Sequence, residues 1–408
     1  MVDNEDIEGV FGTYGTKLTT IMNSASSSWS GFTYQGLCAI HYALALINNN
    51  WGFVETRKLN LESYEDFAIL DENDLIISFH QCKEYGSAKD WTGECEKMSD
   101  KHDYWASKDK LSPNYDKMYF HSNQNNTYAC GVEQYVYKTE NGLCGPDKIV
   151  DLIDQEISEI IIKHGFPGSH EIKRDRLISM IAQKVEELHD ICIRTGQRMF
   201  DVAASNSISF KQISKYLKDD STKLNFTEVA ITCRSYMIIH MMDRYANDSF
   251  ANGTKVKDFV RSLEELDIQS LEQFIKRIFP DVDLNADNIS VRSKERANTL
   301  YNVINDVEKD IERPDLNWVK DGLTLLTPST LGRDVRSEEH CRNIVNNNYP
   351  GDVIRDYRWI VGDVKSKIED IIETAHTITI SSSMDYSDIT NPTKVGLLDI
   401  NSMNNGDY

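Results

Sequence analysis

The spacing of apolar residues changes at about residue 147, and no other feature of the sequence constrains the fold as strongly. Residues 64–83 and 117–138 contain short runs rich in β-branched and aromatic residues, which are typical of strands. From residue 147 onward, apolar residues recur every three or four positions, as in helices that bury one face. We therefore predict an α+β chain, with an N-terminal α/β domain over 1–145 and a mostly α-helical region with a polar C-terminal tail over 146–408.

Two segments refine this prediction. Residues 84–115 are polar and weakly periodic, so we expect a long loop or short helices there. Residues 356–376, DYRWIVGDVKSKIEDIIETAH, are interpreted as a final amphipathic helix. No alternating strands of the kind that a mixed α/β sensor fold requires are expected in residues 147–378.

A helix and a strand hairpin are expected ahead of the polar segment. Residues 31–47, GFTYQGLCAIHYALALI, carry apolar side chains at helical spacing. The runs YEDFAIL and LIISFHQCK are separated by DEND, a polar cluster suited to a turn between antiparallel strands. Pairing Leu70 with Leu75 across this turn would place Asp66 opposite Phe79.

That register would gather polar side chains on one face of the hairpin. Glu62 would lie opposite Lys83, and directly opposed residues share a face. Gln81 would point the same way as Lys83, because side chains two positions apart on a strand share a face. The hairpin would therefore bring these three residues together with Asp66. A slip by one residue would put Glu65 in the place of Asp66.

A carboxylate beside an amide and a lysine has the parts that phosphodiester hydrolysis requires. A divalent metal neutralises charge on the phosphate and activates water, and hard oxygen ligands suit magnesium. A lysine beside the metal can orient the nucleophile or stabilise the developing charge. Asp66 on one strand and the pair Gln81 and Lys83 on the next strand supply these parts on one face.

The order of these residues resembles that of the PD-(D/E)xK nucleases, in the variant where glutamine replaces the second acid. The helix start GFTYQ, followed by LESYEDFAIL and SFHQCK, is similar to the nuclease domain at the N-terminus of bacterial antiphage effectors such as the CBASS double-stranded DNA endonucleases. The resemblance covers the expected N-terminal domain. It implies a restriction-endonuclease-like fold with a mixed sheet and hydrolysis of double-stranded DNA.

Carried over residue by residue, the resemblance also implies roles. Asp66 would be a metal ligand, Gln81 a second ligand or organiser of the metal site, and Lys83 the catalytic lysine. Glu62 would assist the metal or its water, and Gln35 of GFTYQ would lie at the edge of the site. The implied cofactor is Mg²⁺ or Mn²⁺.

The helical region carries no catalytic motif of its own, since GxxxxGK[ST], GxGxxG, GxSxG and HExxH are all absent from the sequence. Its length and position resemble those of the nuclease subunit (LmuA) of Lamassu systems, also called ABC-three-component systems. That resemblance implies an SMC-like ATPase subunit (LmuB) and a small third subunit (LmuC) as partners, with self-association of the active form. The alternative is a non-catalytic helical assembly subunit that retains a nuclease-like fold.

The charge of the chain bears on how it could meet DNA. A formal net charge of −21 argues against a broad basic surface for nucleic acid, so DNA binding would need a local basic patch, a metal ion or a basic partner. No apolar run approaches the roughly 20 residues that cross a bilayer. The acidic start MVDNEDIEG lacks the basic region of a signal peptide, and we expect a cytoplasmic protein without membrane contact.

The eight cysteines are scattered, with no CxxC pair, and are expected to be buried reduced thiols. A zinc site can be drawn from Cys82, Cys95, His102 and Cys130, but its spacing matches no established zinc pattern.

Charged and histidine side chains in the helical region are expected to be structural. His189 and His240 fall on apolar helix faces and are interpreted as core histidines. Lys173, Arg174 and Arg176 begin a helix, where a solvated helix start is favoured over contact with phosphate.

Overall fold

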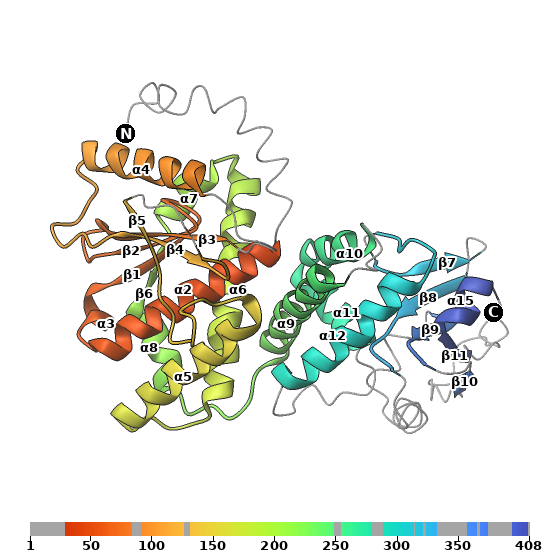
Figure 1. Cartoon of the computed structure of the whole chain (residues 1–408). Helices are drawn as coiled ribbons and strands as arrows, with labels where there is room; N and C mark the ends of the chain where they lie inside the picture. The colour runs from red at the N-terminus through yellow and green to blue at the C-terminus, as the bar shows by residue number, and fades with distance from the viewer. Residues whose placement is uncertain are drawn as a thin grey trace, which may run out of the picture.

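A six-stranded mixed sheet forms the centre of the N-terminal lobe in the computed structural model (Figure 1). The structure describes residues 29–83, 91–125, 131–248, 254–278, 289–313, 315–320, 324–332, 357–364, 368–373 and 394–406. In the sheet order β5-β4-β3-β2-β1-β6, the strands are β1 (Lys58–Leu61), β2 (Phe67–Leu70), β3 (Ile76–Lys83), β4 (Met118–Ser122), β5 (Val132–Gln134) and β6 (Ile208–Ser209). Strands β3, β4 and β5 are parallel and the other pairs antiparallel, so the predicted mixed sheet is confirmed.

Helices cover both faces of this sheet. Helix α2 (Trp29–Asn49) lies on one face and α4 (Thr92–Ser107) on the other (Figure 1). Strand β3 is buried along nearly its whole length as a result. Its Cys82 belongs to the core shared with α2, whereas Phe79 packs with Met98 in the core beneath α4. The segment predicted as a long loop or short helices therefore contains one regular helix, α4.

The helices that follow residue 145 belong to the same lobe. They are α5 (Pro146–His164), α6 (His170–Thr195), α7 (Met199–Ala204) and α8 (Phe210–Lys218), and the short α3 (Phe53–Thr56) packs against α8. Side chains of α5, α6 and α8 share one hydrophobic core with α2 and the sheet, and β6 extends the sheet beside β1. The predicted division between 1–145 and 146–408 therefore does not coincide with a boundary between cores.

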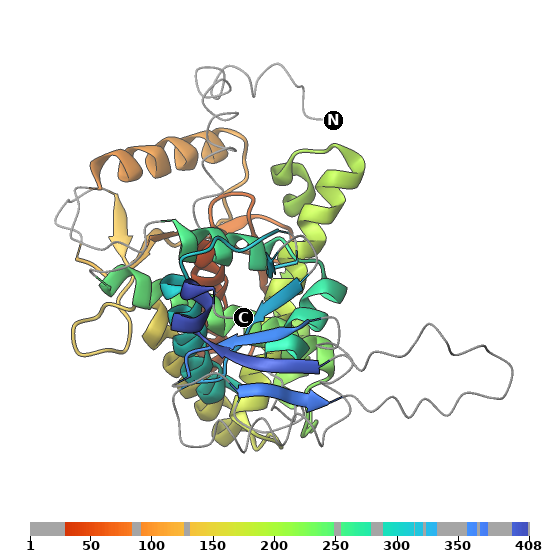
Figure 2. The ribbon, with the colours of Figure 1, turned by 90° about the vertical axis from the view of Figure 1, so that its right-hand side faces the viewer.

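The second lobe combines helices with a sheet of its own. Helices α9 (Phe226–Asn247), α10 (Lys255–Glu264), α11 (Ile268–Ile278) and α12 (Ile289–Asp306) pack together, with α9 in contact with the other three. A five-stranded sheet of order β10-β11-β9-β8-β7 follows, and α15 (Ile400–Asn405) packs against it (Figure 2). Its strands are β7 (Trp318–Lys320), β8 (Thr324–Pro328), β9 (Trp359–Gly362), β10 (Ile368–Glu373) and β11 (Lys394–Asp399).

This second sheet overturns three expectations. The final helix predicted over 356–376 is wrong, because that segment contains β9 and β10, and strands therefore do occur within 147–378. The polar C-terminal tail is wrong for the described residues, because β11 lies inside the sheet between β10 and β9. The reason is burial: Trp359, Ile360 and Val361 are consecutive and all buried. A central strand covered on both faces shows no alternation and resembles a buried helix segment in sequence.

The register of the N-terminal hairpin differs from the predicted one by two residues. Ala68, rather than Asp66, lies opposite Phe79, and Phe67 lies opposite His80. The pairing is interrupted by a bulge between Ile69 and Leu70. Because two is an even number, this shift keeps Asp66 on the face of Gln81 and Lys83. Glu62 follows β1 and lies outside the hairpin strands, so its predicted position opposite Lys83 is wrong.

The turn accounts for one residue of this shift, and the bulge between Ile69 and Leu70 accounts for the other. Asp71 donates its backbone N–H to the carbonyl of Leu75, and its side chain accepts the N–H groups of Asn73 and Leu75. Ser112 donates to the second oxygen of this carboxylate. These bonds draw Leu75 into the turn, so that Leu70 pairs with Ile76 instead.

The two lobes meet along helix α9, which packs against α2, α5 and α6 (Figure 1). Among the helices that the structure describes, none is long and apolar enough to cross a membrane.

Candidate functional site

Asp66 and Gln81 meet where the loop between β1 and β2 touches β3. The carboxylate oxygen Oδ2 of Asp66 accepts two hydrogen bonds. One comes from Nε2 of Gln81 at 2.5 Å and the other from the backbone N–H of Cys82 at 2.7 Å. Asp66 precedes β2 by one residue, and continuing the observed register places it beside Gln81. Burial raises the pKa of Asp66 to about 6, while the charge of Lys83 opposes this rise. The structure therefore brings together three of the predicted site residues.

Glu62 belongs to the same cluster but adopts an unusual backbone conformation. It is the first residue after β1, with φ of 60°, and its N–H donates to the carbonyl of Asp66 at 3.2 Å. A side chain larger than glycine seldom occupies this left-handed region, and such strain is often found at functional sites. Burial, together with the charges of Asp66 and Glu65, raises the pKa of Glu62 well above its usual range, and Lys83 acts in the opposite direction.

Glu65 is the residue that a one-residue slip would have exchanged for Asp66, and it joins the cluster by another route. Its side chain is only 5% exposed and forms an ion pair with Lys101 of α4. Burial lowers the pKa of Lys101, but the charges of Glu65 and Asp66 raise it more, so the net shift is upward. The sequence did not predict Lys101, because no local pattern indicates which side chain α4 presents to the β1–β2 loop.

Gln35 lies in α2, on the helix that carries GFTYQ. Its side-chain oxygen Oε1 is buried and has no hydrogen-bond donor within the described part of the chain. The neighbouring Tyr34 donates to the carbonyl of Cys144 at 2.7 Å. The contacts of the described residues do not link Gln35 to Asp66 or Lys83, so its place at the edge of the site stays a prediction.

The oxygen atoms of this cluster are of the kind that magnesium prefers, but Oδ2 of Asp66 and Oε2 of Glu65 are already engaged. Asp66 accepts from Gln81 and Cys82, and Glu65 is paired with Lys101. Among the residues that the structure describes, no group of three or more His, Cys, Asp or Glu side chains could hold a metal ion. In this arrangement the side chains do not fit the implied Mg²⁺ or Mn²⁺.

A second polar cluster lies on the α2 side of β3. Ser78 Oγ and His80 Nε2 are 2.8 Å apart, His80 Nδ1 and His121 Nε2 are 2.9 Å apart, and His121 Nδ1 lies 2.6 Å from the hydroxyl of Tyr137. Tyr137 also donates to Cys38 at 3.2 Å. Burial holds the pKa of both histidines well below its usual range. These neutral groups therefore join β3, β4 and α2 as a satisfied polar core.

Of the cysteines that the structure describes, five are free thiols, as expected, whereas Cys95 is disulfide-bonded, which the sequence did not predict. Cys82 packs on the α2 face of the sheet and Cys95 on the α4 face, so the zinc site drawn from the sequence does not assemble among the described residues. The described free thiols belong to Cys38, Cys82, Cys144, Cys192 and Cys233.

The basic start of α6 is buried rather than solvated, so the favoured interpretation of the sequence is wrong. Arg174 is 3% exposed and pairs with Asp154 and Asp175. Arg176 pairs with Asp219 and Glu228, and Lys173 donates to the carbonyl of Asp219. The acids on α5 and α9 and after α8 hold these cations inside the protein, where they cannot reach a phosphate.

His189 and His240, interpreted from the sequence as core histidines, are both half-buried. Burial lowers the pKa of His189 on α6. The ring of His240 on α9 stacks on Tyr236, with 6.4 Å between ring centroids. These surroundings agree with a structural role.

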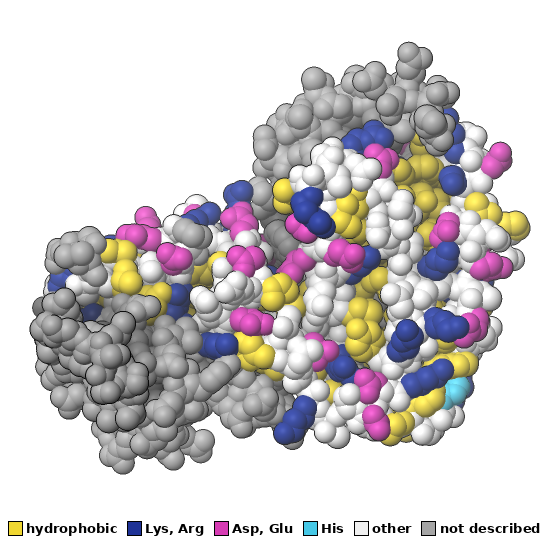
Figure 3. Space-filling model, turned by 180° about the vertical axis from the view of Figure 1, so that it is seen from behind, with side chains coloured by type: hydrophobic (Ala, Val, Ile, Leu, Met, Phe, Trp, Pro, Cys, Tyr) yellow, Lys and Arg dark blue, Asp and Glu magenta, His cyan; other side chains and the backbone are white. Residues whose placement is uncertain are grey.

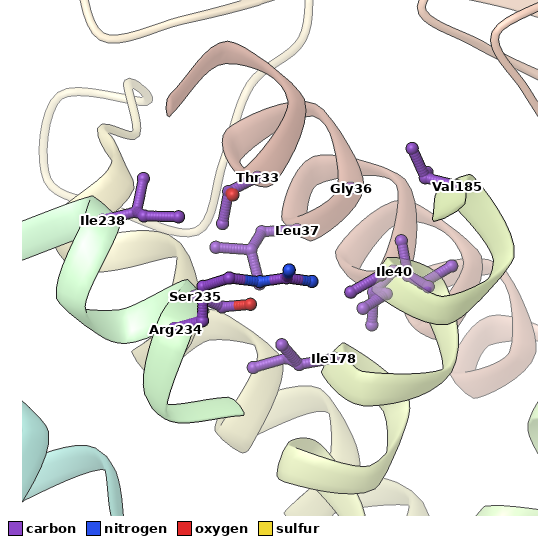
Figure 4. Close-up of a pocket in the computed structure, with 11 residues that line it drawn as sticks. Thr33, Gly36, Leu37, Ile40, Ile178, Val185, Arg234, Ser235 and Ile238 are labelled. Atoms are coloured by element: carbon purple, nitrogen blue, oxygen red, sulfur yellow. The ribbon is translucent and has the colours of Figure 1, made fainter. Parts of the chain in front are cut away.

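A small apolar cavity lies away from the acidic cluster, between α2, α6 and α9 (Figure 4). Its volume is about 40 Å³, and Leu37, Ile40 and Ile178 contribute to its walls. The guanidinium of Arg234 extends across it and pairs with Glu186. A space of this size cannot admit a nucleotide or a drug-sized ligand.

The family model for C-terminal domain 1 of the ABC-three component (ABC-3C) systems matches residues 132–375, which is more than half of the chain. The match begins at β5 and extends through α5 to α12 into the second sheet. No curated protein and no solved structure shows a significant match. The chain therefore belongs to the family of proteins that carry C-terminal domain 1 of the ABC-three-component systems.

Proposed function

We propose that this protein is the DNA endonuclease effector of a bacterial antiphage ABC-three-component system, hydrolysing phosphodiester bonds of double-stranded DNA. The observation that carries the proposal is the contact between Asp66 and Gln81, with Lys83 two residues further along β3 and close enough to both acids to oppose their pKa rise. A carboxylate, an amide and a lysine near the C-terminal end of β3 match the parts that this chemistry requires. Membership of the ABC-three-component family supports the defence context.

In this proposal the residues have different tasks. Lys83 orients the attacking water or stabilises charge that develops on the phosphate. Asp66, Gln81 and Glu62 would provide the oxygen atoms for Mg²⁺ or Mn²⁺, which requires that the bonds from Gln81 and from the Cys82 N–H to Asp66 rearrange.

The charge of the chain suggests that partner subunits control its binding to DNA. The net charge of −21 disfavours binding of isolated protein to DNA. On the face shown in Figure 3, acidic and basic side chains are interspersed and form no basic band. We propose that association with an SMC-like ATPase and a small third subunit, followed by self-association, creates a basic path for DNA.

Cleavage of supercoiled plasmid in Mg²⁺, with the chain alone and with its partner subunits and linear DNA, tests the proposal. Cleavage should be lost in Asp66→Ala and in Lys83→Ala, because each removes a group at the reacting centre. Lys97→Ala is the matched control, since Lys97 is exposed on α4 and should leave cleavage unchanged. Full cleavage by the two site variants would contradict the proposal.

The second candidate is a non-catalytic assembly subunit with a nuclease-like fold. It is favoured by one observation: the side chains of Asp66 and Glu65 are bonded within the protein rather than arranged around a metal position. Absence of cleavage in every oligomeric state, with all partners and with Mn²⁺ as well as Mg²⁺, would favour this candidate.

A further inference from the structure

Arg234 of α9 contacts both lobes beside the small apolar cavity. Its side chain is 4% exposed, and its guanidinium pairs with Glu186 of α6 in the first lobe. The same guanidinium donates to the carbonyl of Leu266 at 3.4 Å, two residues beyond the end of α10 in the second lobe. Figure 4 shows the side chain extending across the cavity. One buried cation therefore lies between an acid of the first lobe and the end of a helix of the second.

Glu264, the last residue of α10, is a buried carboxyl near this guanidinium. The residue is 5% exposed, and its Oε1 has no hydrogen-bond partner within the described part of the chain. Burial raises the pKa of Glu264 to about 9, while the charge of Arg234 opposes this rise. The other charges that act on it belong to Glu265 and Arg261, which pair with each other at 3.1 Å. Glu264 is therefore protonated at neutral pH, with the buried Arg234 beside it.

The cavity gives the guanidinium room to change its partner. Its volume of about 40 Å³ is more than one water molecule needs, so a side chain at its border can shift without overpacking the core. A move of Arg234 toward α10 would leave Glu186 to solvent, to which 24% of its side chain is already exposed. It would also place a positive charge on Glu264. An adjacent cation favours the ionised carboxylate, so Glu264 would release its proton to solvent.

We propose that Arg234 is a two-position switch between the lobes, which exchanges Glu186 for Glu264 and releases one proton as it does so. In the first position Arg234 joins α9 to α6 across the junction. In the second position it joins α9 to α10 within the second lobe. Higher pH favours the second position, because Glu264 must lose its proton to take part in the pair. The exchange does not involve the acidic cluster at β3, so it stands independently of the proposed function.

Urea unfolding of the full chain at several pH values tests this exchange. Glu264 keeps its proton in the folded state and loses it on unfolding, so its contribution makes the chain less stable as pH rises from 6 to 8. Glu264→Gln lacks this proton. The unfolding equilibrium constant of the unmodified chain should therefore rise with pH more steeply than that of Glu264→Gln, by about tenfold per pH unit.

Glu186→Ala removes the first partner of Arg234 and is the decisive variant. If Arg234 then pairs with Glu264, that carboxylate is ionised in the folded state as well, and Glu186→Ala should follow the shallow pH dependence of Glu264→Gln. Adding Arg234→Met to Glu186→Ala should restore the steep dependence, because the cation that ionises Glu264 is gone. Glu187→Ala is the matched control, since Glu187 lies on the same helix, pairs with Lys184 and is 53% exposed. It should keep the steep dependence of the unmodified chain.

An ion pair that merely supports the fold gives a different result. Loss of Glu186 would then destabilise the chain by the same factor at every pH and leave the steep dependence intact, which would overturn the proposal. Equal pH dependence of the unmodified chain and Glu264→Gln would also overturn it, because Glu264 would then carry no proton to release.

Discussion

Glu62 combines a strained backbone with a carboxylate that burial and two neighbouring acids disfavour in its charged form. Left-handed backbone costs about 1–2 kcal/mol for a residue with a Cβ atom. The backbone hydrogen bond from the N–H of Glu62 to the carbonyl of Asp66 would form with any side chain at position 62. The backbone therefore does not require an acid at this position. At the scale of the residue, Glu62 has the features of a group kept for function at a cost in stability.

Glu62→Gly is therefore expected to raise the free energy of unfolding by about 0.5–1 kcal/mol, because glycine adopts the left-handed region without strain. The same variant should lose plasmid cleavage if Glu62 assists the reaction. Urea unfolding and the plasmid assay measure the two effects. Asp109→Gly is the matched control, because Asp109 has φ of 52° but is exposed after α4. A loss of stability in Glu62→Gly would show that its side chain supports the fold.

Among the elements, α2 and α6 approach each other at a glycine. A Cβ atom added at Gly36 would lie 2.9 Å from Cγ2 of Ile181, closer than carbon atoms pack. The close contact brings α6 onto the helix that covers the sheet, and it borders the apolar cavity between α2, α6 and α9. Gly36 therefore sets the spacing between the layer beside the sheet and the outer helical layer.

Gly36→Ala should lower the free energy of unfolding by about 1–3 kcal/mol, the usual effect of overpacking a dense core. The control is Gly93→Ala in α4, where a Cβ atom would meet nothing within 4 Å. That change should stabilise the protein by up to ~1 kcal/mol, because alanine favours helix. Denaturant titration of both variants gives the comparison. If Gly36→Ala and Gly93→Ala changed the free energy of unfolding equally, the close contact at Gly36 would not matter for stability.

Across the whole molecule, a buried polar network joins the two lobes. Asp175 of α6 accepts from Arg174 and from the hydroxyl of Tyr236 on α9, both at 2.8 Å. Thr232 of α9 donates to the carbonyl of Asp175 at 3.2 Å. The family match spans both sides of this junction. The network therefore fixes how the N-terminal sheet is held against the α9–α12 helices.

Arg174→Met should reduce the free energy of unfolding by about 3 kcal/mol or more, because it leaves Asp175 buried without its counter-ion. Combining it with Asp175→Asn should recover part of the loss. Arg194→Met on the same helix is the control, since its pair with Asp190 is exposed and worth less than ~1 kcal/mol. These values come from urea unfolding monitored by circular dichroism. If Arg174→Met lowered the free energy of unfolding by less than Arg194→Met does, the buried network would not be a main link between the lobes.

The extent to which the sequence predicted the site differs between residues. Local alternation fixed the face of Gln81 and Lys83, and the even register shift kept Asp66 on that face although the predicted partner was wrong. Lys101 could not be predicted in this way. Its contact with Glu65 joins two segments through the packing of α4, and no short window of sequence encodes which segments pack together.

The sequence alone determined the type of most elements, the position of the hairpin and the grouping of its polar side chains, because periodicity and turn chemistry act over a few residues. The features that depend on burial were decided by the tertiary structure. Strand β9 is covered on both faces and loses its alternation, the cations at the start of α6 become buried through acids on other helices, and the helices after residue 145 complete the core of the N-terminal sheet. Burial of a segment is set by partners far along the chain, so its consequences become visible only in the folded molecule.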